Sequence, residues 1–319
     1  MHPTVSRGRD FAEQGNAASG ADDAPIFSQI EATRWQERRK RICDERVPWD
    51  RYSRRQRSLT WVTVPCLHLS VARSFDYLLI DISNSYTKFA FASKRRISAP
   101  SRIVTSELSS DVVSGFLVQR NVRTLLVSSV VPAKNSAISR AARKKAKVIW
   151  LDWKLKLGVE IDYPKPRSIG ADRLANAAAV VELYGFPAIV VDFGTAVTFD
   201  IVSKRRSYVG GVIAPGLEAM TNFLFQRTAL LPRLSLKEPR HAVGKSTIEA
   251  MLSGAVFGYR GLVREILARI KAEQFPRKKV YVVATGGYAR LIAGRLPEIG
   301  VIRPHLTLEG LRIVANLND

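Results

Sequence analysis

The chain has 319 residues, of which 46% are hydrophobic, and this length is enough for about two globular domains. Two cysteines and four histidines exclude a disulfide scaffold and disfavour a zinc site, and no apolar run reaches the ~18 residues needed to cross a bilayer. We therefore expect a soluble, cytoplasmic protein with no membrane partner, whose formal charge of +22 suggests anionic ligands.

The positive charge is spread along the chain and is not gathered in a tail. Residues 1–75 carry a net charge of +4, whereas residues 76–319 carry +18. Short basic clusters follow apolar segments at 94–96, 143–145, 204–206 and 277–279. No zinc-finger, RNA-binding or basic-zipper motif accompanies them, so a solvated basic surface is favoured over a nucleic-acid-binding face.

The first 74 residues differ in composition from the rest of the chain. Residues 1–58 are rich in Gly, Ala, Ser, Asp and Arg, and we expect residues 1–74 to form a basic, flexible N-terminal extension with at most a charged helix at 31–46. The basic and then apolar stretch at 54–71 imitates a secretory signal, but it starts more than 50 residues into the chain. We interpret this region, which holds both cysteines, as a non-essential extension or a translation start assigned too far upstream.

Strand-like and helix-like segments alternate after the extension. A buried strand at 77–81 ends in Asp81, and a second strand at 88–92 follows a short polar turn, which predicts a hairpin. The same pattern recurs 111 residues later, with Asp192 in the place of Asp81. Chance similarity and an aspartate that merely caps a turn are the alternatives for either position.

Two hairpins of this kind predict two related α/β lobes, residues 75–185 and 186–319, that face each other across a cleft. Turns of small residues expose backbone N–H groups that can bind phosphate oxygens, and an aspartate beside them can hold a cation. Two opposed turns could therefore clamp a polyphosphate.

An alanine-rich helix is predicted at 174–184, and Asp172 lies near its N-terminus. The helix dipole favours the ionised form of a carboxyl group at this position. Such a carboxylate could accept a proton from a hydroxyl group, although a plain helix cap explains the same spacing.

Glycine-rich segments at 210–216 and 285–287 lie within or after predicted strands, where the backbone can approach a ligand closely. Residues 244–247 resemble the end of a P-loop. However, position 239 is Pro where the motif needs Gly, and no strand precedes the segment. The P-loop interpretation therefore fails.

A long helix is predicted after this segment. Ser246 and Glu249 form the pattern of a capping box, and the helix should run to about Lys271. Three glycines give it a smooth face for contact with another helix or subunit: Gly254, Gly258 and Gly261.

Taken together and in order, these segments resemble type III pantothenate kinases, also called the Baf or CoaX family, of the actin–hexokinase superfamily. The resemblance covers about 240 residues. The matching segments are 79–85, 128–132, 169–176, 190–200, 210–216, 285–287 and 306–311.

The resemblance implies two actin/hexokinase-like (ribonuclease H-like) lobes around a cleft. It also implies ATP-dependent phosphorylation of pantothenate to 4'-phosphopantothenate, the first step of coenzyme A biosynthesis. The implied cofactors are Mg²⁺ with ATP and a monovalent cation, K⁺ or NH₄⁺. The implied assembly is a homodimer.

The resemblance also implies roles for single residues. Asp172 corresponds to the general base on the substrate hydroxyl, and Asp192 to the ligand of the monovalent cation. The positions that correspond to ATP-binding residues are Asp81, Ser83, Asn84, Ser85, Lys88 and Thr195. The positions that correspond to pantothenate-binding residues are Tyr163, Gly170, Ala171, Asp172, Arg173 and Thr247.

One position departs from the pattern of the family. Ser83 stands where the first turn usually has glycine, and a serine at positive φ or against a phosphate would cost about 1 kcal/mol or more. Two alternatives follow: a catalytically weak homologue that acts as a regulator or binds nucleic acid, and a related small-molecule kinase with another acceptor. The complete segment 170–173 favours pantothenate kinase over both.

Overall fold

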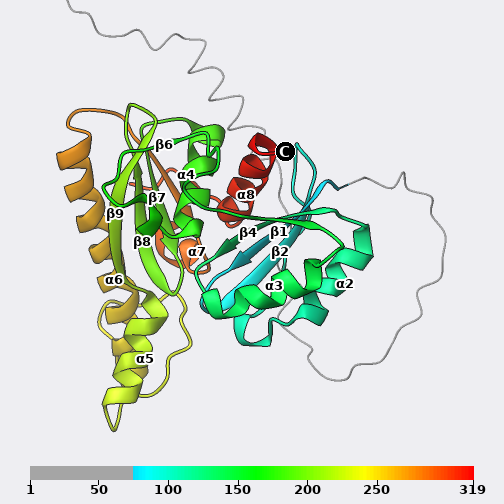
Figure 1. Cartoon of the computed structure of the whole chain (residues 1–319). Coiled ribbons are helices and arrows are strands. Elements are labelled where there is room, and N and C mark those ends of the chain that lie inside the picture. The colour runs from blue at the N-terminus through cyan, green and yellow to red at the C-terminus, as the bar shows by residue number, and fades with distance from the viewer. Residues whose placement is uncertain (1–74) are drawn as a thin grey trace, which may run out of the picture. The chain divides into compact units, whose positions relative to one another are not determined.

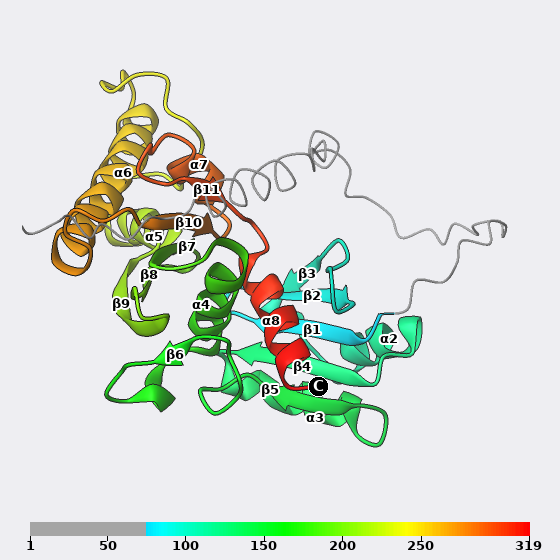
Figure 2. The ribbon, with the colours of Figure 1, turned by 90° about the horizontal axis from the view of Figure 1, so that it is seen from above.

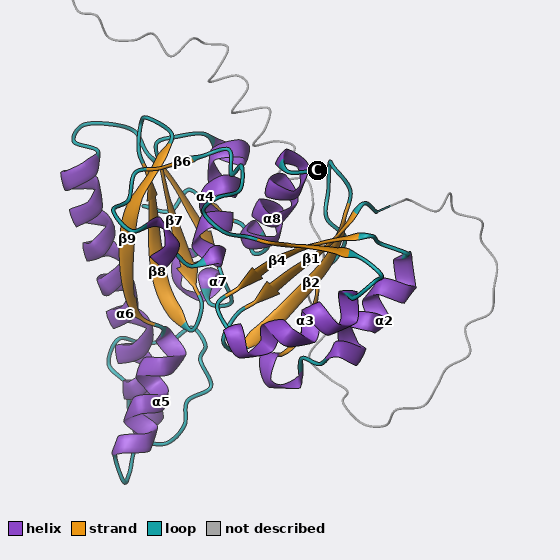
Figure 3. Ribbon diagram, viewed as in Figure 1, coloured by secondary structure: helices purple, strands orange, loops and turns teal. Residues whose placement is uncertain are grey.

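The computed structural model describes residues 75–319, so the predicted extension, its helix at 31–46 and both cysteines lie outside the described residues. The described part contains two mixed β-sheets with helices on their faces and between them (Figures 1 and 3). None of the helices in this part is both long enough and apolar enough to cross a membrane.

The first sheet consists of β1 (Tyr77–Ile82), β2 (Tyr86–Ala92), β3 (Ser101–Val104), β4 (Thr124–Ser129) and β5 (Lys147–Trp150). The strands lie in the order β3-β2-β1-β4-β5. All six residues of β1 are buried, as expected for a central strand with both faces covered. β1 pairs antiparallel with β2, which confirms the predicted hairpin, and parallel with β4.

The second sheet consists of β6 (Glu160–Ile161), β7 (Ala188–Phe193), β8 (Ala196–Val202), β9 (Ser207–Pro215), β10 (Tyr281–Thr285) and β11 (Val301–Ile302). The strands lie in the order β11-β10-β7-β8-β9-β6. β7 pairs antiparallel with β8, which confirms the second hairpin, and parallel with β10.

The two sheets repeat one topology. Each has three antiparallel strands followed by two parallel ones, and the second sheet adds β6 at its edge. This repetition confirms the two-lobed α/β fold class. The division of the lobes at residue 185 stays a prediction, since β6 precedes that point in the chain but pairs with β9.

Seven α-helices lie in the described part: α2 (Ser110–Arg120), α3 (Asn135–Ala142), α4 (Ala171–Tyr184), α5 (Leu217–Arg227), α6 (Thr247–Gln274), α7 (Ala289–Ala293) and α8 (Leu306–Leu317). Short 3₁₀ helices occur at Thr105–Glu107, Pro132–Lys134 and Pro166–Ser168. α2 and α3 cover one face of the first sheet, α6 covers the second sheet, and α4 and α8 lie side by side between the sheets (Figures 1 and 2). Each sheet has its own apolar core, built around Phe89 and Ile138 in the first and Phe199 and Val256 in the second.

The helix pair α4 and α8 joins the two sheets. Gly310 of α8 lies so close to α4 that a Cβ atom there would collide with the backbone oxygen of Ala175. α8 also contacts β1 and β4, whereas α4 contacts β7 and β8. Side chains of α4 and α8 can therefore lie close to the ends of both hairpins.

The long helix α6 begins as predicted. Ser246 Oγ accepts a hydrogen bond from the backbone N–H of Glu249 (3.3 Å), and the Glu249 carboxylate accepts one from the N–H of Lys245 (2.8 Å). The helix ends at Gln274, three residues beyond the predicted end. A Cβ atom added to any of its three glycines would meet nothing within 4 Å, so this face is open: Gly254, Gly258 and Gly261.

Candidate functional site

The first hairpin turn places a charged pair at the end of β1. Asp81 is buried, and Lys88 lies directly opposite it in the hairpin register. The Lys88 ammonium is 3.7 Å from Asp81 Oδ2, and Ser83 Oγ donates to the same oxygen at 3.3 Å. The other oxygen, Asp81 Oδ1, is buried without a hydrogen-bond partner. Asn84 is exposed at the tip of the turn.

The backbone of this turn accepts Ser83 without strain. The non-glycine residues with positive φ in the described part are Asn121, Lys144, Arg206 and Arg277. Ser83 therefore does not need the left-handed conformation that would favour glycine. Its N–H donates to the oxygen of Tyr86 (3.2 Å), which closes the turn.

The second hairpin turn holds Asp192 in a different way. Its register partner is Thr198, so no cationic residue lies opposite the carboxylate. Asn176 Nδ2 donates to Asp192 Oδ2 at 3.2 Å. The other oxygen, Oδ1, faces Gly286, where a Cβ atom would lie only 2.5 Å away. Burial raises the pKa of Asp192, and the charge of Lys88 opposes this rise.

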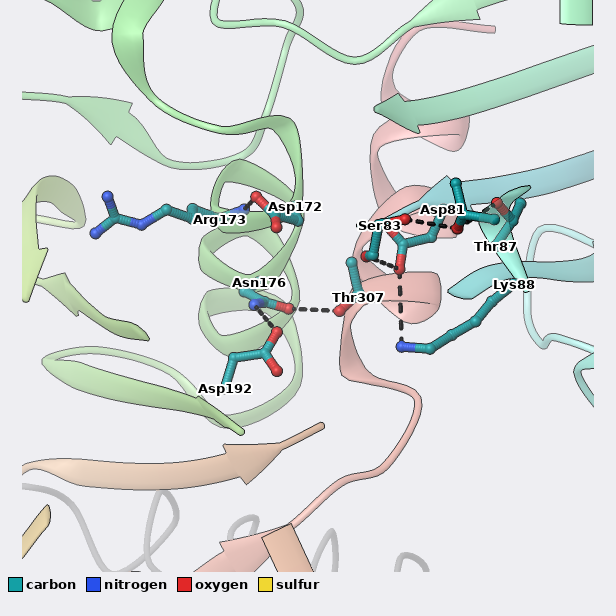
Figure 4. A network of polar contacts seen from close by, with 10 residues as sticks. Asp81, Ser83, Thr87, Lys88, Asp172, Arg173, Asn176, Asp192 and Thr307 are labelled. Carbon is teal, nitrogen blue, oxygen red and sulfur yellow. Dashed lines mark hydrogen bonds and ion pairs between the residues drawn. The ribbon is translucent and has the colours of Figure 1, made fainter. Parts of the chain in front are cut away.

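The two turns meet through their hydroxyl groups. Ser85 Oγ and Thr195 Oγ1 are 2.9 Å apart, although they are 110 residues apart in the chain. The structure thus brings the predicted ATP-binding residues of both lobes together. Figure 4 shows Asp81, Ser83 and Lys88 on one side, with Asp172, Asn176 and Asp192 on the other.

Asp172 lies in the first turn of α4, as predicted, and its Oδ1 accepts a hydrogen bond from the N–H of Arg173 (2.8 Å). Gly170 makes room for it, because a Cβ atom there would lie 2.6 Å from the same oxygen. Burial, together with the negative charges of Asp81 and Asp192, raises the pKa of Asp172 to about 7. A carboxyl group with this pKa can both accept and release a proton near neutral pH.

Arg173 is held by a buried carboxylate. Its Nε donates to Asp200 Oδ1 at 2.6 Å, and Tyr208 donates to the same oxygen at 3.3 Å. The ring of Tyr163 lies edge-on against Tyr208, with 6.1 Å between centroids. Arg173 Nη2 is buried without a hydrogen-bond partner, so the site has a donor available for a ligand.

Of the remaining predicted residues, two lie beside Asp172 and one does not contact the other candidates. Gly170 caps α4 and Ala171 is its first residue, so both lie beside Asp172. Thr247 is exposed at the first position of α6, and within residues 75–319 no hydrogen bond connects it with the other candidates. Its role stays a prediction.

Asn176, Thr307 and Asp200 received no role from the sequence, although all three lie in the network. Asn176 is one helical turn after Asp172, and this i,i+4 spacing could have placed both on one face. Thr307 and Asp200 gave no such signal, because their contacts join segments that are distant in the chain: Thr307 meets Asn176, and Asp200 meets Arg173.

The oxygen atoms of the site fit hard cations. No cluster of three or more His, Cys, Asp or Glu side chains in the described region could hold a metal ion alone. Asp81 Oδ1 is an unpartnered buried acceptor that suits Mg²⁺ carried by a nucleotide or its bound water. A side chain at position 286 would cover Asp192 Oδ1, so Gly286 leaves this oxygen uncovered, which suits a single monovalent cation.

Repeated sheets with aspartate-ended hairpins, joined by two helices, define a protein of the actin-like class. The solved structure of a Campylobacter jejuni protein described as a Baf family transcriptional activator shares this fold, with a TM-score of 0.50 and 20% identity over 75% of this chain and 97% of that one.

The family is shown by sequence comparison. The model of the type III pantothenate kinase family matches residues 77–269. The type III pantothenate kinase of Akkermansia muciniphila is 49% identical over 76% of this chain and 99% of its own length. That of Methylacidiphilum infernorum is 42% identical over 75% of this chain and 88% of its own length. The chain belongs to the type III pantothenate kinase family.

Proposed function

We propose that this chain transfers the γ-phosphoryl group of ATP to the hydroxyl group of pantothenate, giving 4'-phosphopantothenate, in the first step of coenzyme A biosynthesis in the cytoplasm. The observation that carries the proposal is the position of Asp172 beside both hairpin turns, with a pKa near 7. Family membership supports the choice of acceptor.

Asp172 acts as the general base. Its carboxylate accepts the proton of the acceptor hydroxyl as that oxygen bonds to phosphorus and the bond from phosphorus to the ADP oxygen breaks. Phosphoryl transfer depends mainly on positioning and charge neutralisation, so a base with a pKa near the working pH is sufficient. The N–H of Arg173 fixes the orientation of the carboxylate.

The first turn binds the phosphates of ATP. Asn84 and Ser85 are exposed in this turn, where backbone N–H groups can bind phosphate oxygens, and Lys88 supplies a positive charge. Thr195 completes this set from the second turn. Mg²⁺ that arrives with ATP would be held near Asp81 and would neutralise phosphate charge.

Asp192 holds the monovalent cation, K⁺ or NH₄⁺. The carboxylate has no cationic residue opposite it in the strand register, and the lack of a side chain at Gly286 leaves its Oδ1 uncovered. A bound cation would offset the charges of Asp192 and Asp172 and would favour the ionised form of the base.

Arg173 and Tyr163 bind pantothenate together with Gly170 and Ala171. The unpartnered Nη2 of Arg173 donates to an oxygen of the substrate. Asp200 already balances the charge of Arg173, so this donor recognises its partner chiefly by geometry. Thr247 is assigned to the same substrate by resemblance alone.

The assembly is a homodimer that forms on the open face of α6. The three glycines of this helix leave room for another helix, and apolar side chains nearby are exposed, including Phe223 (58%) and Ile248 (52%). Exposed apolar surface of this kind marks an interaction site. Replacing Gly258 by Arg should yield a monomer in light scattering, and an unchanged dimer would place the interface elsewhere.

The experiment that tests the function identifies the product. Purified full-length protein is incubated with Mg-ATP and K⁺ plus pantothenate, a hexose or no acceptor, and the products are analysed by mass spectrometry. We expect phosphorylated pantothenate and no sugar phosphate. A folded protein that phosphorylates only the sugar would support a small-molecule kinase with another acceptor. A folded protein that gives no product at all would support a catalytically weak homologue that acts as a regulator.

A further inference from the structure

Asn176 connects three elements of the site. Its side chain is buried on α4, with 1% of its surface exposed. It donates to Asp192 Oδ2 at the end of β7 (3.2 Å) and accepts from Thr307 Oγ1 on α8 (2.9 Å). Figure 4 shows Asn176 between these two partners.

Thr307 determines which way the amide points. A side-chain amide has one acceptor oxygen and one donor nitrogen, and a carboxylate can only accept. Because Thr307 donates to Asn176 Oδ1, the nitrogen must face Asp192. Thr307 is itself buried, so water does not compete for this contact.

The helix packing holds this arrangement in place. Asn176 is four residues after Asp172 on α4, so both side chains lie on the same face of the helix. Gly310 allows α8 to approach the backbone of α4 at Ala175, next to Asn176. The same two helices contact the first and second sheets, so the amide lies at the joint between the lobes.

We propose that Asn176 is a positioning residue, oriented by Thr307, that ties down one oxygen of Asp192 so that the other is presented to the monovalent cation. This inference rests on the proposed function of Asp192. It assigns a task to a side chain that neither touches the cation nor reacts. A neutral donor suits this task, because it orients the carboxylate without neutralising the charge that attracts the cation.

The experiment compares two disruptive variants with one conservative control in the full-length protein. Asn176→Leu keeps the approximate size and removes the donor, Thr307→Val removes the hydroxyl that orients the amide, and Thr307→Ser retains it. Two quantities are measured for each: the K⁺ concentration for half-maximal ADP release, and the rise in melting temperature that KCl produces relative to choline chloride without ATP.

We expect Asn176→Leu to raise the half-saturating K⁺ concentration about tenfold or more, the loss typical of one hydrogen bond to a charged group. The stabilisation by K⁺ should fall in parallel. Thr307→Val should show a smaller change in the same direction, and Thr307→Ser should behave as the wild type. At saturating K⁺, the KM for pantothenate should stay near the wild-type value.

Two results would overturn the inference. Lower melting temperatures in both disruptive variants, with unchanged half-saturating K⁺, would show that the network only stabilises the fold. A wild-type protein that responds to K⁺ in neither measurement would remove the cation site and the inference with it, while persistent pantothenate-dependent ADP release would leave the kinase activity standing.

Discussion

The two hairpin turns have the same topology, but different residues lie opposite their aspartates. Asp81 lies opposite Lys88, whereas Asp192 lies opposite Thr198. The first carboxylate is therefore paired with an ammonium group from its own hairpin. The second accepts a hydrogen bond from the neutral amide of Asn176, and Lys88 of the first hairpin acts on it through its charge without forming an ion pair.

The two turns also differ in length by one residue. Ile82 pairs with Thr87 in the first hairpin, but Phe193 pairs with Val197 in the second, so the second turn is one residue shorter. The ungapped offset of 111 residues aligns Thr87 with Thr198, but the strand register makes Thr198 the counterpart of Lys88. The first turn thus has a lysine opposite its aspartate, and the second has a threonine, which leaves room for the proposed cation.

The largest expected effect is at Asp172, which both turns flank. Asp172→Asn should lower kcat about a thousandfold, because asparagine cannot accept the proton of the acceptor. Steady-state ADP release measures this. Near-normal turnover by the variant would remove Asp172 as the base.

The same variant should be more stable than the wild type at pH 8. The pKa of Asp172 is about 7 in the folded protein and near 3.8 when unfolded, so its ionised form destabilises the fold above pH 7, and this cost disappears as the pH falls toward 4. Removing the charge should add stability on the order of a few kcal/mol at pH 8. Thermal melts at pH 8 and pH 5 should show a gain that shrinks at the lower pH.

Placing a positive charge opposite Asp192 should weaken the requirement for a monovalent cation. Thr198→Lys places an ammonium group opposite Asp192, as Lys88 is placed opposite Asp81. We expect stimulation by K⁺ to fall at least about tenfold, because the internal charge competes with the added ion. Thr198→Met has similar length without charge and should keep the requirement. If folded Thr198→Lys protein were stimulated by K⁺ as strongly as the wild type, a charge opposite Asp192 would not compete with the cation.

The pH profile follows from the burial of Asp172 and from the aspartates around it. With a pKa of about 7, kcat/KM for pantothenate should rise about tenfold per pH unit below that value and level off above it. Higher K⁺ should move the midpoint to lower pH, because a cation near Asp192 favours the ionised base. A flat profile from pH 5 to 8 would exclude this role of the carboxyl group.

The smallest effect is expected at Ser83. Because its φ is not positive, glycine has no conformational advantage there, and Ser83→Gly should change the KM for ATP less than about threefold. A tenfold lower KM would show that the phosphate passes against the Cβ of serine. This measurement separates backbone strain from steric contact.

The sequence predicted what depends on local pattern. Both hairpins, the capped start of α6 and the place of Asp172 at a helix N-terminus follow from periodicity and capping residues. The one-residue difference in turn length was not predicted, because an ungapped repeat cannot reveal a shift in strand pairing. The contacts of Asn176 with Thr307 and of Arg173 with Asp200 were also missed, since they depend on packing between distant segments.

Pantothenate kinase activity can be measured as ADP release by the wild-type protein at millimolar Mg-ATP, with and without pantothenate and with K⁺ or choline as the cation. We expect turnover that needs pantothenate and is strongly stimulated by K⁺. A folded protein that releases no ADP under these conditions, or releases it equally without pantothenate, would contradict this expectation.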